Sequence, residues 1–175
     1  MNEKTKKLCL SAVCLALCMV LPFLTGQIPQ IGSALSPMHI PVLLCGLLCG
    51  WQYGLVIGFA APLLRFVLFG MPPIMPTGLA MMFELAAYGA LSGVLLKLLP
   101  GKLSCLYASL VGAMLGGRMV WGIARFVLGL VVGPSFTLAA FLSGAFVSAI
   151  PGIVCHILLI PPVVIGVRRA LKLEI

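Results

Sequence analysis

Long apolar stretches separated by short polar breaks run along the whole chain. Many of these stretches are long enough to span a bilayer as helices. The alternation of apolar and polar residues that is typical of barrel strands is absent from the sequence. No polar segment is long enough to form a soluble domain. The pattern therefore predicts an all-α membrane protein in which residues 1–175 form a single transmembrane domain.

The number of helices depends on residues 39–70. One continuous helix over this segment would be about 48 Å long, which is too long for a single span. Two helices joined near Gly50-Trp51-Gln52-Tyr53-Gly54 are the alternative, although each is short for a bilayer. With two helices in this segment, the chain is predicted to have six transmembrane helices, at about residues 8–24, 39–50, 52–69, 77–98, 104–132 and 137–167.

The distribution of positive charge supports six helices. Eight of the basic residues lie in three clusters: Lys4, Lys6 and Lys7; Lys97 and Lys102; and Arg168, Arg169 and Lys172. Six helices place all three clusters on one side of the membrane, whereas five would move the second and third clusters to the other side. Because basic residues favour the cytoplasmic side, we predict six transmembrane helices with both termini cytoplasmic. The net charge of +8 then reflects topology rather than nucleic-acid binding.

Composition agrees with a membrane location and leaves few groups for chemistry. The 175 residues are 62% hydrophobic and 8% charged, and the mean hydropathy is +1.25. The seven cysteines form no CxxC pair and have no polar neighbours that would support a metal, so they are predicted to pack as small apolar residues. The sequence contains no nucleotide-binding loop, no HExxH and no GxSxG. Neither an enzyme nor a bound cofactor or metal is predicted.

Four charged residues in the apolar segments are not explained by topology: Arg65, Glu84, Arg118 and Arg125. An ionised side chain near the bilayer centre costs about 2.5–3.5 kcal/mol on insertion scales, so such groups usually pair or line a wet cavity. Counting residues from the helix ends puts Glu84 and Arg125 at similar depth, where they could pair. The outer half of the bundle would then hold more guanidinium groups than carboxylates. Arginine is well suited to bind a carboxylate, so this surplus favours an anionic ligand.

Three further residues complete the predicted substrate-binding set. His39 begins its helix at the outer face, Tyr88 lies one turn from Glu84, and Trp121 lies three residues from Arg118. His156, in the inner half of the last helix, is interpreted as a packing histidine. A structural alternative is that Arg65 reaches the headgroups, Arg118 bonds to carbonyl groups, and Glu84 and Arg125 form an ion pair without any ligand.

The chain resembles the substrate-binding S components of energy-coupling factor (ECF) vitamin transporters, which are small six-helix membrane proteins. The resemblance rests on the size of the chain, the early Ala12-x-x-x-Ala16 motif and the outer loop that leads into SPMHIPVLLCG. It implies that Ala12 and Ala16 dock on the transmembrane coupling subunit, which joins two ATPase subunits. It also implies that the chain captures a vitamin outside the plasma membrane and topples in the membrane when the ATP-driven module engages it.

The segments SPMHIPVLLCG, PLLR-x-x-x-FGMPP and FELAAYG, together with Gly117-Arg118, are most similar to the pantothenate-specific members. Pantothenate is a small carboxylate with two hydroxyls and an amide, which fits an arginine-rich site. Lipoate, nicotinate, folate and a pyridoxine-type ligand are alternatives. Other classes are also open: a self-sufficient carrier or channel, a membrane enzyme that acts on lipid, or a scaffold subunit without a ligand.

Overall fold

The computed structural model describes residues 2–24, 35–99, 103–132, 137–144 and 149–171. Throughout these residues the secondary structure is helical. The helices are α1 (Glu3–Leu24), α3 (His39–Cys49), α4 (Trp51–Phe69), the π-helical turn η1 (Ile74–Gly78), α5 (Leu79–Leu98), α6 (Leu103–Val132), α7 (Leu138–Leu142) and α8 (Ile150–Leu171). The prediction of an all-α protein is confirmed.

Five stretches of the described chain are long and apolar enough to cross a membrane: 3–24, 51–69, 74–98, 103–131 and 150–171. The predicted helix at 137–167 is divided in the structure into the short α7 and the longer α8. The part of that prediction at 145–148 lies outside the described residues, as do most of the loop at 25–38 and the turn at 133–136.

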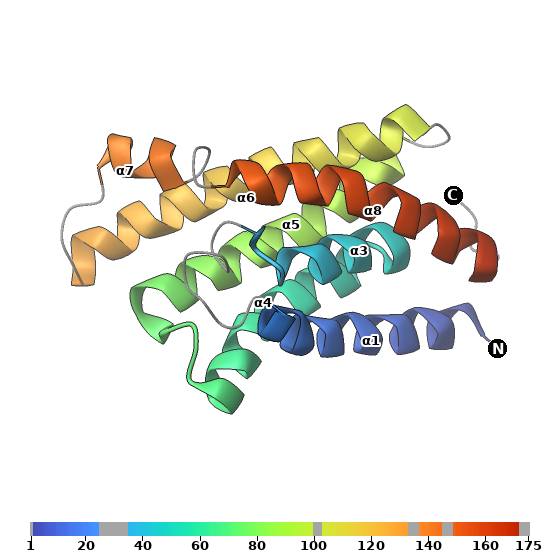
Figure 1. Ribbon diagram of the computed structural model, residues 1–175, viewed down its shortest axis with the longest axis horizontal. Helices are drawn as coiled ribbons and strands as arrows, with labels where there is room; N and C mark the ends of the chain where they lie inside the picture. Colours follow the sequence, from blue (N-terminus) through green and yellow to red (C-terminus); the bar gives the residue numbers. More distant parts are fainter. Residues whose placement is uncertain (1, 25–34, 100–102, 133–136, 145–148, 172–175) are drawn as a thin grey trace.

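Helix α3 has a different character from the five candidate spans. It is only 11 residues long, about 16 Å, which is roughly half the thickness of a hydrocarbon core. Ten of its 11 residues are buried, and it packs against α1, α4, α5 and α8. Residues 39–69 thus form two helices that meet at Gly50, with α3 as a central buried helix enclosed by longer ones (Figure 1).

Glycines form the joints and the close contacts of this bundle. Gly50 separates α3 from α4 with a φ of 102°, a conformation that L side chains rarely adopt. Helix α5 crosses α4 so closely that a Cβ atom at Gly89 would overlap the carbonyl group of Gly54, and one at Gly93 would overlap the backbone of Trp51. Gly89 and Gly93, which lie four residues apart on α5, thus form a small-residue motif that serves packing within the bundle.

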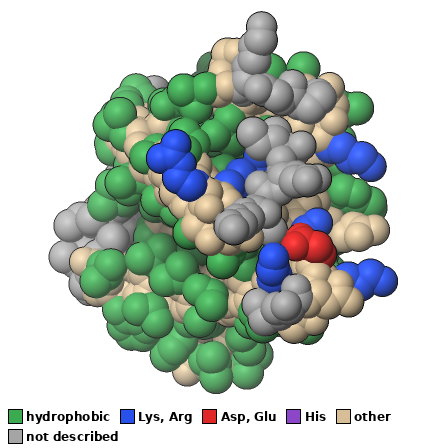
Figure 2. All heavy atoms as spheres, turned by 90° about the vertical axis from the view of Figure 1, so that its right-hand side faces the viewer, with side chains coloured by type: hydrophobic (Ala, Val, Ile, Leu, Met, Phe, Trp, Pro, Cys, Tyr) green, Lys and Arg blue, Asp and Glu red, His purple; other side chains and the backbone are tan. Residues whose placement is uncertain are grey.

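The first turn of α1 and the last turns of α5 and α8 lie at the same end of the molecule (Figure 1). We call it the basic end, because these turns carry basic side chains: Lys4, Lys6 and Lys7 on α1, Lys97 on α5, and Arg168 and Arg169 on α8. Figure 2 looks onto this end and shows Lys and Arg side chains gathered there. The turn between α4 and α5 lies at the opposite end (Figure 1). Lys102 and Lys172 lie outside the described residues.

Candidate functional site

The buried Glu84 is the centre of a polar cluster in the middle of the bundle. Glu84 is 1% exposed and belongs to the span at 74–98, about 15 Å along the helix from its beginning and about 21 Å from its end. Arg118 of α6 approaches the Glu84 carboxylate with a distance of 2.9 Å from Nη1 to Oε1. The Tyr88 hydroxyl donates to the same oxygen at 3.1 Å. A buried carboxylate is thereby paired and hydrogen-bonded, as burial in an apolar medium requires.

Local sequence explains how these groups meet. Tyr88 follows Glu84 by four residues, so both side chains lie on one face of α5. Gly117 lets the Tyr88 ring lie against α6, because a Cβ atom at this position would overlap the ring. Arg118 is the next residue on α6 and its guanidinium group reaches the same carboxylate.

Two histidines complete the cluster. His39 at the beginning of α3 is 4% exposed, with Nε2 3.5 Å from Glu84 Oε1 and its ring 5.0 Å from the Tyr88 ring. This separation permits electrostatic contact, but the geometry does not make a hydrogen bond. His156 of α8 stacks on His39, with ring centroids 6.1 Å apart and an interplanar angle of 19°.

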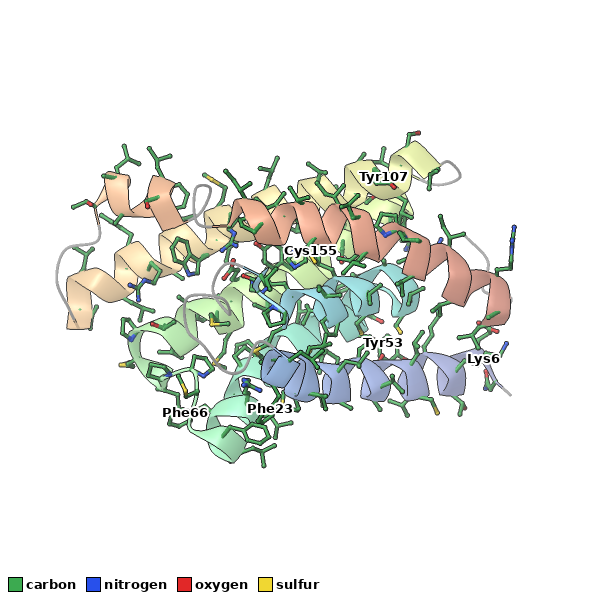
Figure 3. All side chains as sticks on the ribbon, viewed as in Figure 1. Lys6, Phe23, Tyr53, Phe66, Tyr107 and Cys155 are labelled. Carbon is green, nitrogen blue, oxygen red and sulfur yellow. The ribbon has the colours of Figure 1, made fainter. Side chains whose placement is uncertain are left out.

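The positions of His39 and His156 in the structure differ from the depths inferred for them from the sequence. His39 was expected at the outer face and His156 in the inner half of the bundle, but the two rings are in contact deep in the interior. Counting residues failed for His39 because α3 begins inside the bundle, and it failed for His156 because α8 begins only at Ile150, six residues before it. Cys155, the neighbour of His156, accordingly lies away from both ends of the bundle in Figure 3.

A cavity of about 80 Å³ borders the cluster. Tyr88, Arg118 and His156 supply its polar wall, and the remaining lining residues are apolar: Val111, Met114, Leu115, Ile153 and Ile157. A few converging polar groups in an otherwise apolar pocket are typical of sites for small molecules. The interpretation of His156 as a packing residue therefore missed a cavity-lining side chain. The only sign in the sequence that His156 lines a cavity is that it is a polar residue within an apolar helix.

Arg65 lies apart from this cavity. Its Nη1 donates to the Met19 carbonyl of α1 at 2.9 Å, and its guanidinium carbon lies 5.3 Å and 5.4 Å from the centroids of the Phe23 and Phe69 rings. Arg65 is 5% exposed, so its side chain is held within the protein rather than projecting from the protein surface. Phe23 lies at the end of α1 opposite Lys6 (Figure 3), and the arginine joins α1 to α4 near that end.

The two remaining predicted site residues lie further along α6. Trp121 stacks on Phe141 of α7, with ring centroids 6.3 Å apart. Arg125 is two helical turns, about 10 Å, from Arg118 and on nearly the same face of α6. The depth estimate that pointed to Arg125 as the partner of Glu84 was not accurate enough, because the ion pair to Glu84 is made by Arg118.

The cysteines on α1 and α3 take part in packing and weak hydrogen bonding. Cys18 Sγ lies 3.7 Å from the Met38 carbonyl oxygen, and Cys45 Sγ lies 3.6 Å from Ser11 Oγ. In the part of the chain that the structure describes, no three His, Cys, Asp or Glu residues are grouped so that they could hold a metal ion.

Comparison with known protein families identifies the family of this chain. Residues 6–164 match the family described as ECF transporter, substrate-specific component. The chain belongs to this family. Neither a curated protein nor a solved structure matched the S component in the other comparisons. As a family property, S components are transport subunits and not enzymes, and they work in the membrane with an ECF coupling module. The apolar helices of the chain agree with a multi-pass membrane protein.

Proposed function

We propose that this S component binds a small anionic vitamin, with pantothenate as the first candidate, and delivers it to an ATP-driven coupling module. The observation that carries the proposal is the buried polar cluster of Glu84, Arg118, Tyr88 and His39 beside a cavity. A protein that only had to pack in lipid would gain little from this cluster, because each charged group is costly to insert. Pantothenate offers a carboxylate together with hydroxyl and amide groups, which matches a mixed polar wall.

We assign the ligand's carboxylate to the face of α6 that carries Arg118 and Arg125. Arg118 borders the cavity and pairs with Glu84, and Arg125 lies about 10 Å further along the same face. A ligand extended along this face would place polar groups at both positions. Arg65 has no place in this arrangement, because its guanidinium group is bound between α1 and α4.

Binding of pantothenate to the purified protein in detergent tests the proposal, with calorimetry as the measurement. We expect one-to-one binding and a loss of affinity of at least about tenfold for Arg125→Ala, because a charge-assisted hydrogen bond contributes about 1.5–3 kcal/mol. Arg169→Ala, an exposed position at the basic end, is the matched control. Lipoate, nicotinate, folate and pyridoxine complete the panel. Binding of one of these instead would correct the ligand, and unchanged affinity in Arg125→Ala would contradict the role of Arg125.

The coupling partners are proposed from the family and from the surface of α1. Ala12 and Ala16 are exposed, whereas the buried residues Ser11, Cys14, Cys18 and Pro22 form the face of α1 that packs on the bundle. The exposed alanines give a smooth strip on which another helix could pack closely. We assign this strip to the transmembrane coupling subunit, which in turn joins two ATPase subunits. The rival function is a self-sufficient carrier or channel, which would transport in liposomes without that module.

The proposed topology is six transmembrane helices in the plasma membrane with both termini cytoplasmic. Its support is the gathering of basic side chains at one end of the bundle (Figure 2). In this arrangement, α3 runs from the polar cluster to the basic end and α4 returns to the opposite side. The turn between α4 and α5 then faces outward.

A further inference from the structure

The cavity has an unused hydrogen-bonding group, the ring of His156. This histidine is 3% exposed and borders the cavity, and its Nε2 has no hydrogen-bond partner among the residues that the structure describes. Buried polar groups are nearly always hydrogen-bonded, so an atom of this kind calls for an explanation. An open cavity beside it offers one, because a group that enters the cavity can satisfy it.

The surroundings of Nδ1, the other nitrogen of the ring, determine which kind of hydrogen-bond partner Nε2 needs. The His156 ring lies against the backbone carbonyl groups of Leu35 and Ser36, and because Nε2 has no hydrogen-bond partner, Nδ1 is the nitrogen that faces them. A backbone carbonyl only accepts, so Nδ1 carries the proton. In a neutral imidazole the second nitrogen is then a lone-pair acceptor. Nε2 therefore requires a donor, which a hydroxyl or an amide N–H can supply and a carboxylate cannot.

The charge of the surrounding groups leads to the same conclusion. The Glu84 carboxylate is paired with Arg118, so with neutral histidines the cluster has no net charge. A carboxylate in the cavity would add a negative charge close to Glu84 in a medium of low dielectric constant. A hydroxyl adds no charge, and it can accept from Arg118 or Tyr88 while it donates to His156.

The cavity's size also suits a part of a ligand rather than the whole. Its volume of about 80 Å³ holds a few water-sized groups. The lining beyond the polar wall is aliphatic, which suits the carbon atoms that carry a hydroxyl.

We propose that the cavity between α5, α6 and α8 binds the neutral, hydroxyl-bearing end of the ligand, with His156 Nε2 accepting from the hydroxyl. This inference rests on the proposed vitamin-binding function and adds a rule for specificity. Ligands that carry a hydroxyl donor at a distance from any carboxylate are favoured. Lipoate and nicotinate, which carry a carboxylate but no hydroxyl, are disfavoured.

Calorimetry with matched ligands tests the rule. The probes are pantothenate, its alcohol panthenol, and an N-acyl-β-alanine that keeps the amide and carboxylate but has no hydroxyl. His156→Leu should lower the affinity for pantothenate and for panthenol by about tenfold, and should leave the already weak binding of the hydroxyl-free acid unchanged. His156→Gln, which keeps an acceptor oxygen, should retain part of the affinity. An equal loss for all three probes, or no loss for any, would overturn the proposal.

The melting temperature of the unliganded protein gives a second readout that needs no ligand. Loss of the Nδ1 bond to the backbone should lower the melting temperature of His156→Leu, whereas His156→Gln keeps an amide donor for the backbone carbonyl and should melt close to the wild type. A clear fall in both His156→Leu and His156→Gln would mean that His156 holds the helices together, and would overturn the proposal. If pantothenate does not bind the wild-type protein but pyridoxine does, the ligand assignment fails while the hydroxyl rule stands. Tight binding of lipoate or nicotinate, unaffected by His156→Leu, contradicts the rule itself.

Discussion

Arg118 has two tasks that a single substitution would not separate. It borders the cavity, and it neutralises a carboxylate that is only 2% exposed at its side chain. Loss of affinity in an Arg118 variant could therefore come from the ligand contact or from an uncompensated charge at Glu84. The two contributions can be separated when the carboxylate is neutralised as well.

Arg118→Ala is expected to destabilise the protein, because breaking a buried ion pair costs about 3–5 kcal/mol when one charge remains. The double variant Glu84→Gln with Arg118→Gln removes both charges and should recover most of that loss. The melting temperature in detergent is the measurement, with Arg169→Ala as control. Equal melting temperatures for Arg118→Ala and wild type would show that the pair contributes nothing to stability.

At the scale of elements, the crossing of α4 and α5 depends on the absence of side chains. Gly54 and Gly58 of α4 face Gly89 and the backbone at Leu85 of α5. The motif Gly54-x-x-x-Gly58 is visible in the sequence, but its partner on α5 is not, because any of the other helices could have packed there.

Gly89→Ala should lower the melting temperature, because the added Cβ atom would overlap the Gly54 carbonyl group and push α4 away from α5. Overpacking of this kind costs about 1–3 kcal/mol. Gly166→Ala on α8 is the matched control, because a Cβ atom there meets nothing within 4 Å. A similar melting temperature for the two variants would contradict close packing at this crossing.

The prediction about the transmembrane coupling subunit concerns helix α1. Replacing Ala12 and Ala16 with Leu should abolish ATP-dependent uptake in proteoliposomes that contain the coupling module, because bulky side chains prevent close approach of a helix. Both positions are exposed, so ligand binding in detergent should be unchanged. Leu17→Phe, on another exposed part of α1, is the control and should transport normally. Loss of binding together with uptake would place the two alanines in the bundle's own packing.

At the scale of the whole molecule, the gathering of basic side chains at one end predicts the orientation in the membrane. In a cysteine-free background, Met71→Cys in the turn between α4 and α5 should react with a membrane-impermeant thiol reagent added outside the cell. Lys97→Cys at the end of α5 should react only after permeabilisation. The reverse pattern would invert the proposed topology and move the cavity's access to the other side.

The sequence alone determined the class of the protein, the break between the two helices of residues 39–70, and the family. Apolar runs of helical length and basic residues near their ends are local properties, because lipid admits helices whatever surrounds them. The break near Gly50 was also predicted, since one helix over residues 39–70 would be too long for a single span and would separate the basic clusters. The same local logic identified Arg65, Glu84, Arg118 and Arg125 as costly charged groups that needed a reason.

Only the tertiary structure decided how these groups are paired. Depth counted along a helix assumes that every helix begins at a membrane surface, and α3 begins inside the bundle. The buried start of α3 places His39 beside His156. The packing of α5 on α6 pairs Glu84 with Arg118 rather than Arg125, and the packing of α4 on α1 brings Arg65 to a carbonyl of α1. Contacts between α3, α5, α6 and α8 depend on how helices that are far apart in the sequence pack together. Neither periodicity nor charge along the chain contains that information.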